Sequence, residues 1–158
     1  SRRRSMAGPS GCGLCGIESI EHMTRDILPL QAANLPSQAA LDSALSGMRH
    51  GQVVSQSTSG AHAAVWCDMD GSIVALREDV GRHNALDKLI GWHSSELADG
   101  FVLVSSRASY EMVAKAATAG IGVLAAVSAP TSMAIETAKT ANLKLIAFAS
   151  NGRHALYS

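Results

Sequence analysis

The second half of the chain alternates between short apolar, β-favouring runs and helical segments, and this alternation constrains the fold most narrowly. Strands are expected over residues 101–105, 123–128 and 144–148, and helices over 83–92, 109–119 and 131–141. Alternation of this kind is typical of βαβ crossovers, in which helices cover the faces of a mostly parallel sheet. The sequence therefore predicts an α/β sandwich.

Two further elements are predicted upstream of this region. Leu41, Ala44, Leu45 and Met48 recur at helical spacing after Ser37, a good N-cap residue, so a helix is expected over 37–50. The β-favouring runs 62–67 and 72–77 flank a segment that ends in Asp-Gly, a strong turn signal. These two runs predict a hairpin.

Length and composition predict one domain and exclude several classes of protein. The 158 residues suit a single core, and a hydrophobic fraction of 47% with 16% charged residues argues against disorder. Thirteen basic residues offset thirteen acidic ones, which argues against nucleic-acid binding. The apolar runs are far shorter than the ~20 residues that cross a membrane. We expect a flexible N-terminal arm over 1–36 and an α/β domain over 37–158.

The three cysteines are too few and too odd in number for a disulfide framework, which predicts a reducing cytoplasm. Cys12 and Cys15 lie three positions apart in a glycine-rich segment, a spacing used in redox and metal chemistry. Three interpretations of this pair stay open. The cysteines are reactive thiols, or they are half of a zinc site completed by Cys67 or histidines, or their spacing is a coincidence without function. The sequence contains no second Cys-x-x-Cys pair that would complete a zinc site.

Polar residues gather at the start of the expected helix 83–92. Arg82, His83 and Asn84 suit an anionic or heterocyclic ligand, although the same charges also fit a solvated amphipathic helix. Upstream, His62 enters a strand from a turn of small residues. It is either a ligand contact or a buried, hydrogen-bonded histidine.

Hydroxyl-rich turns follow two of the expected strands, over 105–111 and 128–132. Ligands of open α/β sheets bind outside the carboxyl ends of the strands, so these turns are expected to edge one crevice. The same residues also fit helix starts, with Ser109 as an N-cap and Pro130 in a first helical turn. The closing segment 148–153 is interpreted as a loop after the last strand. Its aromatic, amide and arginine side chains can stack on a purine and pair with its phosphate, or form a simple terminal turn.

Taken in order, these segments resemble the FdhD family, the accessory sulfurtransferases of formate dehydrogenase. The resemblance rests on Gly11-Cys12-Gly13-Leu14-Cys15-Gly16, the 78–91 run, Ser128-Ala129-Pro130-Thr131 and the closing 148–157. It implies a cytidine deaminase-like three-layer sandwich with a mixed, mostly parallel sheet. It does not imply deamination, because His62 is not followed by the x-Glu of a zinc deaminase and the cysteine pair comes first. No metal site is expected.

The resemblance also implies a function. Cys12 would carry sulfur from a cysteine desulfurase as a persulfide, with Cys15 as its partner, and pass it to the molybdenum bis(molybdopterin guanine dinucleotide) cofactor needed by formate dehydrogenase. The cofactor would be a bound substrate, and a homodimer is expected. The implied cofactor contacts are Phe148, Ala149, Ser150, Asn151, Gly152 and Arg153, together with His62, Arg82, His83 and Arg107.

Three positions depart from the family pattern. Ser59 and Ser106 stand where the family usually has glycine, and Ser150 stands where it usually has arginine, which leaves Arg153 as the cation of the closing segment. The family's usual N-terminal strands are mostly missing from this sequence, so either the chain is shortened or the sequence is only part of it. Two alternatives to sulfur transfer stay open: a non-catalytic chaperone that binds the cofactor, and a zinc-stabilised interaction domain.

Overall fold

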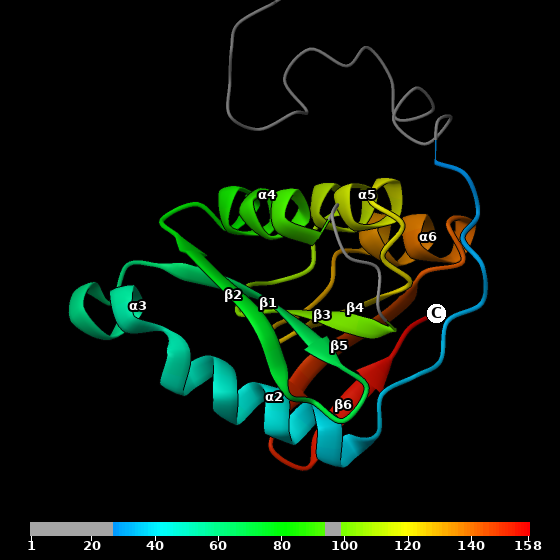
Figure 1. The fold of residues 1–158 in the computed structure, drawn as a ribbon. Coiled ribbons are helices and arrows are strands. Elements are labelled where there is room, and N and C mark those ends of the chain that lie inside the picture. Colours follow the sequence, from blue (N-terminus) through cyan, green and yellow to red (C-terminus); the bar gives the residue numbers. More distant parts are fainter. Residues whose placement is uncertain (1–26, 94–98) are drawn as a thin grey trace, which may run out of the picture.

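The computed structural model describes residues 27–93 and 99–158, which form a mixed sheet with helices on both faces (Figure 1). The strands are β1 (His62–Asp68), β2 (Ile73–Asp79), β3 (Gly100–Val104), β4 (Val123–Ala126), β5 (Lys144–Ser150) and β6 (Arg153–Leu156). Their order is β2-β1-β3-β4-β5-β6. The pairs β3–β4 and β4–β5 are parallel, and the other pairs are antiparallel, so β1 and β6 run against the remaining strands.

The helices form the outer layers of the sandwich. One layer holds α4 (Arg82–His93), α5 (Tyr110–Thr118) and α6 (Ser132–Thr140), and the other holds α2 (Gln38–Gly51), from which α3 (Val53–Thr58) continues (Figure 1). The predicted three-layer α/β sandwich with a mixed sheet is confirmed. The expectation that the sheet is mostly parallel is wrong: among the described strands, three of the five pairs are antiparallel, because β1 and β6 are each joined to a neighbouring strand by a hairpin instead of a helical crossover. The helices expected over 83–92, 109–119 and 131–141 are also confirmed, with each end one residue away from its predicted position.

Both faces of the central strands are buried, and their side chains alternate between two cores. On β3, Val102 and Val104 pack with α4, α5 and α6, while Phe101 and Leu103 pack with α2. All four side chains are at most 1% exposed. Strands covered on both faces have continuous apolar runs, which explains why these segments were recognisable in the sequence.

The predicted first helix and hairpin are also present. Ser37 caps α2, since its hydroxyl accepts a hydrogen bond from the amide of Ala40 at 3.1 Å. In the turn between β1 and β2, Gly71 has φ +90°, and a Cβ there would lie 2.1 Å from the carbonyl oxygen of Ala40. Only glycine fits so close to α2, so the turn and the start of that helix pack directly on each other.

Two elements differ from the sequence prediction. The short helix α3 was not expected, because Val53, Val54 and Thr58 are weak helix formers. It is capped from β2, where the two carboxylate oxygens of Glu78 accept from the amides of Val54 and Ser55 at 2.8 and 2.9 Å. The interpretation of 148–153 as a loop after the last strand is wrong: β5 continues to Ser150, and β6 pairs with it as a second hairpin.

The last ten residues of the predicted arm, 27–36, lie within the described part of the chain. The amide of Leu30 donates to the carbonyl oxygen of Ala141, and the side chain of Asn142 donates to the carbonyl oxygen of Leu30, both at 2.9 Å. This part of the arm is therefore attached to the end of α6. Among the described residues, no helix has both the length and the apolar character needed to span a membrane.

Candidate functional site

The segments that follow β3 and β4 stay paired beyond the regular strands. The amide of Val127 donates to the carbonyl oxygen of Val104 at 3.1 Å, and that of Phe148 donates to the carbonyl oxygen of Ser128 at 3.3 Å. Farther along, the amide of Thr131 donates to the carbonyl oxygen of Ala108 at 3.0 Å. The two hydroxyl-rich turns thus lie side by side at the carboxyl edge of the parallel strands, where α/β sheets bind ligands.

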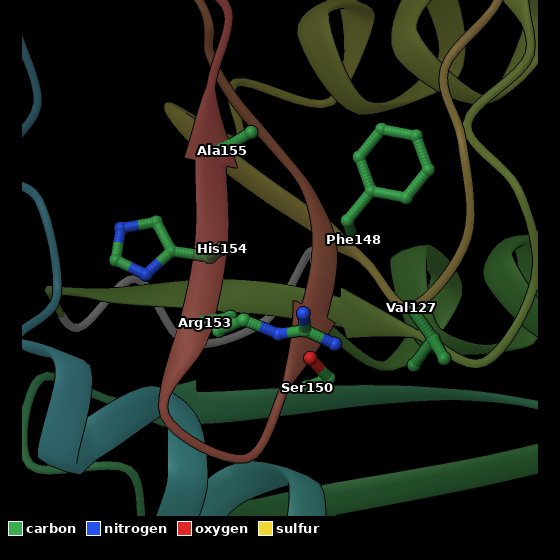
Figure 2. Close-up of a pocket in the computed structure, with 6 residues that line it drawn as sticks. All are labelled: Val127, Phe148, Ser150, Arg153, His154 and Ala155. Atoms are coloured by element: carbon green, nitrogen blue, oxygen red, sulfur yellow. The ribbon is translucent and has the colours of Figure 1, made fainter.

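A cavity of about 420 Å³ opens beside these turns, next to the β5–β6 hairpin. Figure 2 shows its lining residues, which come from the end of β4 and from both strands of the hairpin. They are Val127, Phe148, Ser150, Arg153, His154 and Ala155. The volume falls in the range of about 300–1,000 Å³ typical of small-molecule sites.

Phe148 owes its position to a β-bulge. The pairing of β5 with β6 shifts register between Ala147 and Ser150, and Phe148 adopts φ +53° in the left-handed region. Its side chain is 48% exposed, whereas the next residue, Ala149, is buried against the α2 core. A large aromatic side chain in this backbone region is uncommon and costs energy, and such strain clusters at functional sites. The bulge presents an aromatic ring at the cavity.

Ser150 and Arg153 face each other across the hairpin. They are paired in the β5–β6 ladder, and the guanidinium of Arg153 extends from β6 toward the hydroxyl of Ser150 (Figure 2). Asn151 and Gly152 form the turn between them, with φ +74° at Gly152. An exposed ring, a hydroxyl and a guanidinium therefore border one cavity, a combination that suits a planar base carrying an anionic group.

His62 lies at the same edge of the sheet but on β1, where it pairs with Asp79 of β2. Two hydrogen bonds join the start of β1 to the end of β3. The amide of Ala63 donates to the hydroxyl of Ser105 at 2.8 Å, and the amide of Ser105 donates to the carbonyl oxygen of Ala63 at 3.0 Å. This pairing fixes the strand beside His62. Arg107, two residues beyond Ser105, is exposed.

Asp79 organises the start of α4. Its carboxylate accepts from the amide of Gly81 at 2.9 Å, the side chain of Asn84 at 3.1 Å and the ammonium of Lys88 at 2.7 Å. These hydrogen bonds, with that of Lys88 the strongest, lower the pKa of Asp79 to about 2. Asp79 is therefore a fixed anion that holds the loop leading into α4.

Arg82 and His83 are the first two residues of α4. The Nε atom of Arg82 is buried without a hydrogen-bond partner among the described residues. Burial, and then the charge of Arg82, lower the pKa of His83. His83 is therefore neutral at physiological pH and Arg82 supplies the positive charge, an arrangement suited to an anion at a helix start.

The cavity brings together only part of the predicted contact set. Phe148, Ser150 and Arg153 line it, while Asn151 and Gly152 form the adjoining turn and Ala149 is buried behind it. Within the described ranges, the cavity lining does not include the other predicted contacts, which lie at the ends of β1 and β3 and at the start of α4. These are His62, Arg82, His83 and Arg107.

Sequence reasoning missed Val127, His154 and Ala155 as lining residues. The dipeptide Asn151-Gly152 is a hairpin signal and would have predicted β6, and with it the inclusion of His154 and Ala155. The apolar Val127 carries no such signal, since it lines the cavity only because β4 ends beside β5.

The predicted persulfide carrier Cys12 and its partner Cys15 lie outside the described residues. Cys67 is buried in β1, and its burial, with a smaller contribution from Asp68, raises its pKa to about 12. Residues 27–93 and 99–158 contain no group of three or more His, Cys, Asp or Glu side chains that could hold a metal ion. Cys67 is thus not available to an exposed zinc site.

Comparison with known proteins identifies a family. The profile of the FdhD/NarQ family matches residues 1–158. The chain is 49% identical to the sulfur carrier protein FdhD of Bordetella petrii, in an alignment that covers 100% of the chain and 58% of that protein. It is 48% identical to the sulfur carrier protein FdhD of Burkholderia cenocepacia, over 99% of the chain and 58% of that protein. The chain thus spans less than two thirds of the length of these relatives.

A solved structure has the same fold. It is a crystal structure of a protein assigned as a formate dehydrogenase accessory protein from Desulfotalea psychrophila. It superposes with a TM-score of 0.78 at 26% identity, covering 87% of this chain and 60% of the other.

Proposed function

Because the chain belongs to the FdhD/NarQ family, we propose that it is the part of a sulfur carrier that delivers sulfur for formate dehydrogenase activity. The observation that carries the proposal is the match over residues 1–158, which includes Cys12 and Cys15. Relatives that match at 47–49% identity are named sulfur carrier protein FdhD. They are longer than this chain, so their role comes to it as a proposal.

In the proposed first step, the Cys12 thiolate attacks the outer sulfur of a persulfide on a cysteine desulfurase. The bond between the two donor sulfurs breaks, the donor cysteine leaves as a thiolate, and Cys12 becomes a persulfide. The exchange needs no external oxidant or reductant, because one sulfane sulfur moves between two thiols. Glycines border both cysteines in the sequence, and a neighbouring thiol such as Cys15 is suited to tuning the reactivity of Cys12.

The proposed acceptor is the molybdenum bis(molybdopterin guanine dinucleotide) cofactor, bound as a substrate. The cavity at the β5–β6 hairpin fits its guanine nucleotide part, since Phe148 offers an exposed ring for stacking and Arg153 offers a cation for phosphate. Arg82 at the start of α4 and the exposed Arg107 lie at the same edge of the sheet and suit the remaining phosphates.

The remaining partners follow from the same proposal. A carrier that forms a persulfide needs a reducing compartment, for which we propose the cytoplasm, where its thiols stay reduced. It also needs contact with a cysteine desulfurase and with formate dehydrogenase. A homodimer is proposed as its assembly.

A cofactor-binding chaperone is the second candidate. The observation that favours it is that the cavity is built from residues 127–155, so binding of the nucleotide needs neither cysteine. A zinc-stabilised domain is less well supported, because Cys67 is fully buried and its pKa is raised.

Activation of formate dehydrogenase distinguishes sulfur transfer from the chaperone. Cells lacking their own carrier would receive the wild-type chain or the Cys12→Ala/Cys15→Ala variant. Binding of GDP would be measured on the same proteins. Sulfur transfer predicts lost activation with unchanged GDP binding. Full activation by the double variant would instead support the chaperone.

A further inference from the structure

The β5–β6 hairpin forms one wall of the cavity, yet little within the hairpin itself holds its turn in place. β6 is a four-residue strand at the edge of the sheet that pairs with β5 alone among the described strands, and the bulge at Phe148 interrupts their pairing. Isolated two-stranded hairpins are marginally stable in water. The turn at Gly152 and the position of Arg153 beside it therefore depend on contacts from outside the hairpin.

Helix α2 supplies these contacts. The Oδ1 atom of Asp42 accepts a hydrogen bond from the amide of Gly152 at 3.0 Å, across 110 residues of sequence. The same oxygen accepts from the Nε2 atom of Gln38 at 3.0 Å, and the Oε1 atom of Gln38 lies 2.5 Å from the Nδ1 atom of His154. Asp42 thus touches the turn directly, and Gln38 touches the strand that follows it.

The carboxylate sets the direction of every hydrogen bond in this group. A carboxylate only accepts, so Gln38 must turn its amide nitrogen toward Asp42 and its oxygen toward His154. The Nδ1 atom of His154 is then the donor to Gln38. All four groups have matching partners, and the hairpin is tied to the first turns of α2 at two points, Gly152 and His154.

We infer that Asp42 and Gln38 are positioning residues that hold the β5–β6 hairpin in place and so keep the nucleotide cavity preformed. The inference rests on the proposed function, because it assigns these residues to the binding of the same guanine nucleotide. Asp42 and Gln38 are not among the cavity-lining residues in the described part of the chain, so they act through Gly152, His154 and Arg153. Because the hairpin is already ordered before the ligand binds, binding loses less conformational entropy and the affinity is higher.

A matched pair of variants tests the inference in the full 158-residue chain. Asp42→Asn keeps an oxygen that accepts from Gly152 but removes the charge, whereas Asp42→Ala removes both. Ser43→Ala changes an exposed neighbour on the same helix and is the control. The probes are GDP affinity by calorimetry and hydrogen exchange of the Gly152 amide without ligand, with the thermal midpoint as a check on folding.

We expect Asp42→Ala to weaken GDP binding about fivefold, in keeping with the typical net contribution of one hydrogen bond that orders the cavity wall. The Gly152 amide should exchange at least tenfold faster in that variant. Asp42→Asn and Ser43→Ala should stay close to wild type in both measurements. Near-wild-type GDP affinity and Gly152 exchange in Asp42→Asn would show that the hydrogen bond to Gly152, rather than the stability of α2, determines how the cavity binds GDP.

Other results overturn the inference. Equal protection of Gly152 in all four proteins would mean that Asp42 does not hold the turn. Equally tighter GDP binding by both Asp42 variants would mean that only the negative charge near the phosphate matters. If the wild type bound no GDP, the proposed cofactor site would fail, while the exchange rate of Gly152 would still decide whether Asp42 anchors the hairpin.

Discussion

Asp79 and Lys88 form an ion pair across the start of α4, with 2.7 Å between the carboxylate and ammonium groups. The Lys88 hydrogen bond is the largest of the causes that lower the pKa of Asp79 from 3.8 to about 2. The pair holds the loop that precedes Arg82 and His83. Its contribution to stability depends on Asp79 being ionised in the folded protein.

The first prediction concerns acid stability. Because the folded-state pKa of Asp79 is lowered, its contribution is present above about pH 4 and is lost as the pH falls toward 2. At pH 5 the free energy of unfolding in urea should therefore be larger for the wild type than for Asp79→Asn. This difference should shrink as the pH falls toward 2. Lys88→Met should behave similarly. A difference that is constant with pH would exclude this role for Asp79.

The second prediction concerns the left-handed cap of α3. Ser59 has φ +52°, a conformation that costs about 1 kcal/mol for a residue other than glycine. Ser59→Gly should therefore stabilise the protein by about 0.5–1 kcal/mol in urea unfolding. Ser57→Gly, inside the same helix, is the control and should destabilise it by a similar amount. Destabilisation by both glycines would contradict the strain at Ser59.

The third prediction concerns the aromatic ring at the cavity. Phe148 is 48% exposed, so Phe148→Ala should lower the unfolding free energy by only about 1 kcal/mol and leave the fold intact. Loss of base stacking should weaken GDP binding about tenfold, measured by calorimetry. Leu156→Ala, on the neighbouring strand β6 and 49% exposed, is the matched control and should bind GDP normally. Equal affinity in both variants would remove Phe148 from the site.

The fourth prediction concerns Cys67. Burial and a pKa raised to about 12 leave roughly one part in ten thousand as thiolate at pH 8. Iodoacetamide at that pH should leave Cys67 unmodified in the folded protein and alkylate it in urea, as read by peptide mass. Modification in the folded protein at the rate of a free thiol would contradict the buried position.

Elements with local signals could be predicted from the sequence. The Ser37 cap and the spacing of Leu41 and Leu45 predicted α2, and the apolar runs predicted β3, β4 and β5. By contrast, α3 depends on Glu78, more than twenty residues away, which no local pattern reveals. β6 is polar and lies at the sheet edge, so it lacks the apolar alternation of the inner strands.

The candidate site was predicted by residue type better than by geometry. Phe148 and Arg153 were recognised as a ring and a cation in one short segment, and the structure places both at the cavity. The bulge that exposes Phe148 and the tie between Asp42 and Gly152 are tertiary features, the latter across 110 residues. These contacts join residues that are distant in the sequence, and hydrophobic periodicity predicts only local helices and strands, so it could not predict them.

The central claim is tested most directly by loading the reduced chain with sulfur. The protein would be incubated with a cysteine desulfurase and free cysteine, and the intact mass and the non-reduced peptides would be recorded. The account predicts a gain of one sulfur atom on the peptide that holds Cys12 and Cys15, and no such gain in Cys12→Ala. Wild-type loading in Cys12→Ala would remove Cys12 from the role. If the wild-type chain gained no sulfur while both thiols were free, sulfur transfer by this chain would be contradicted.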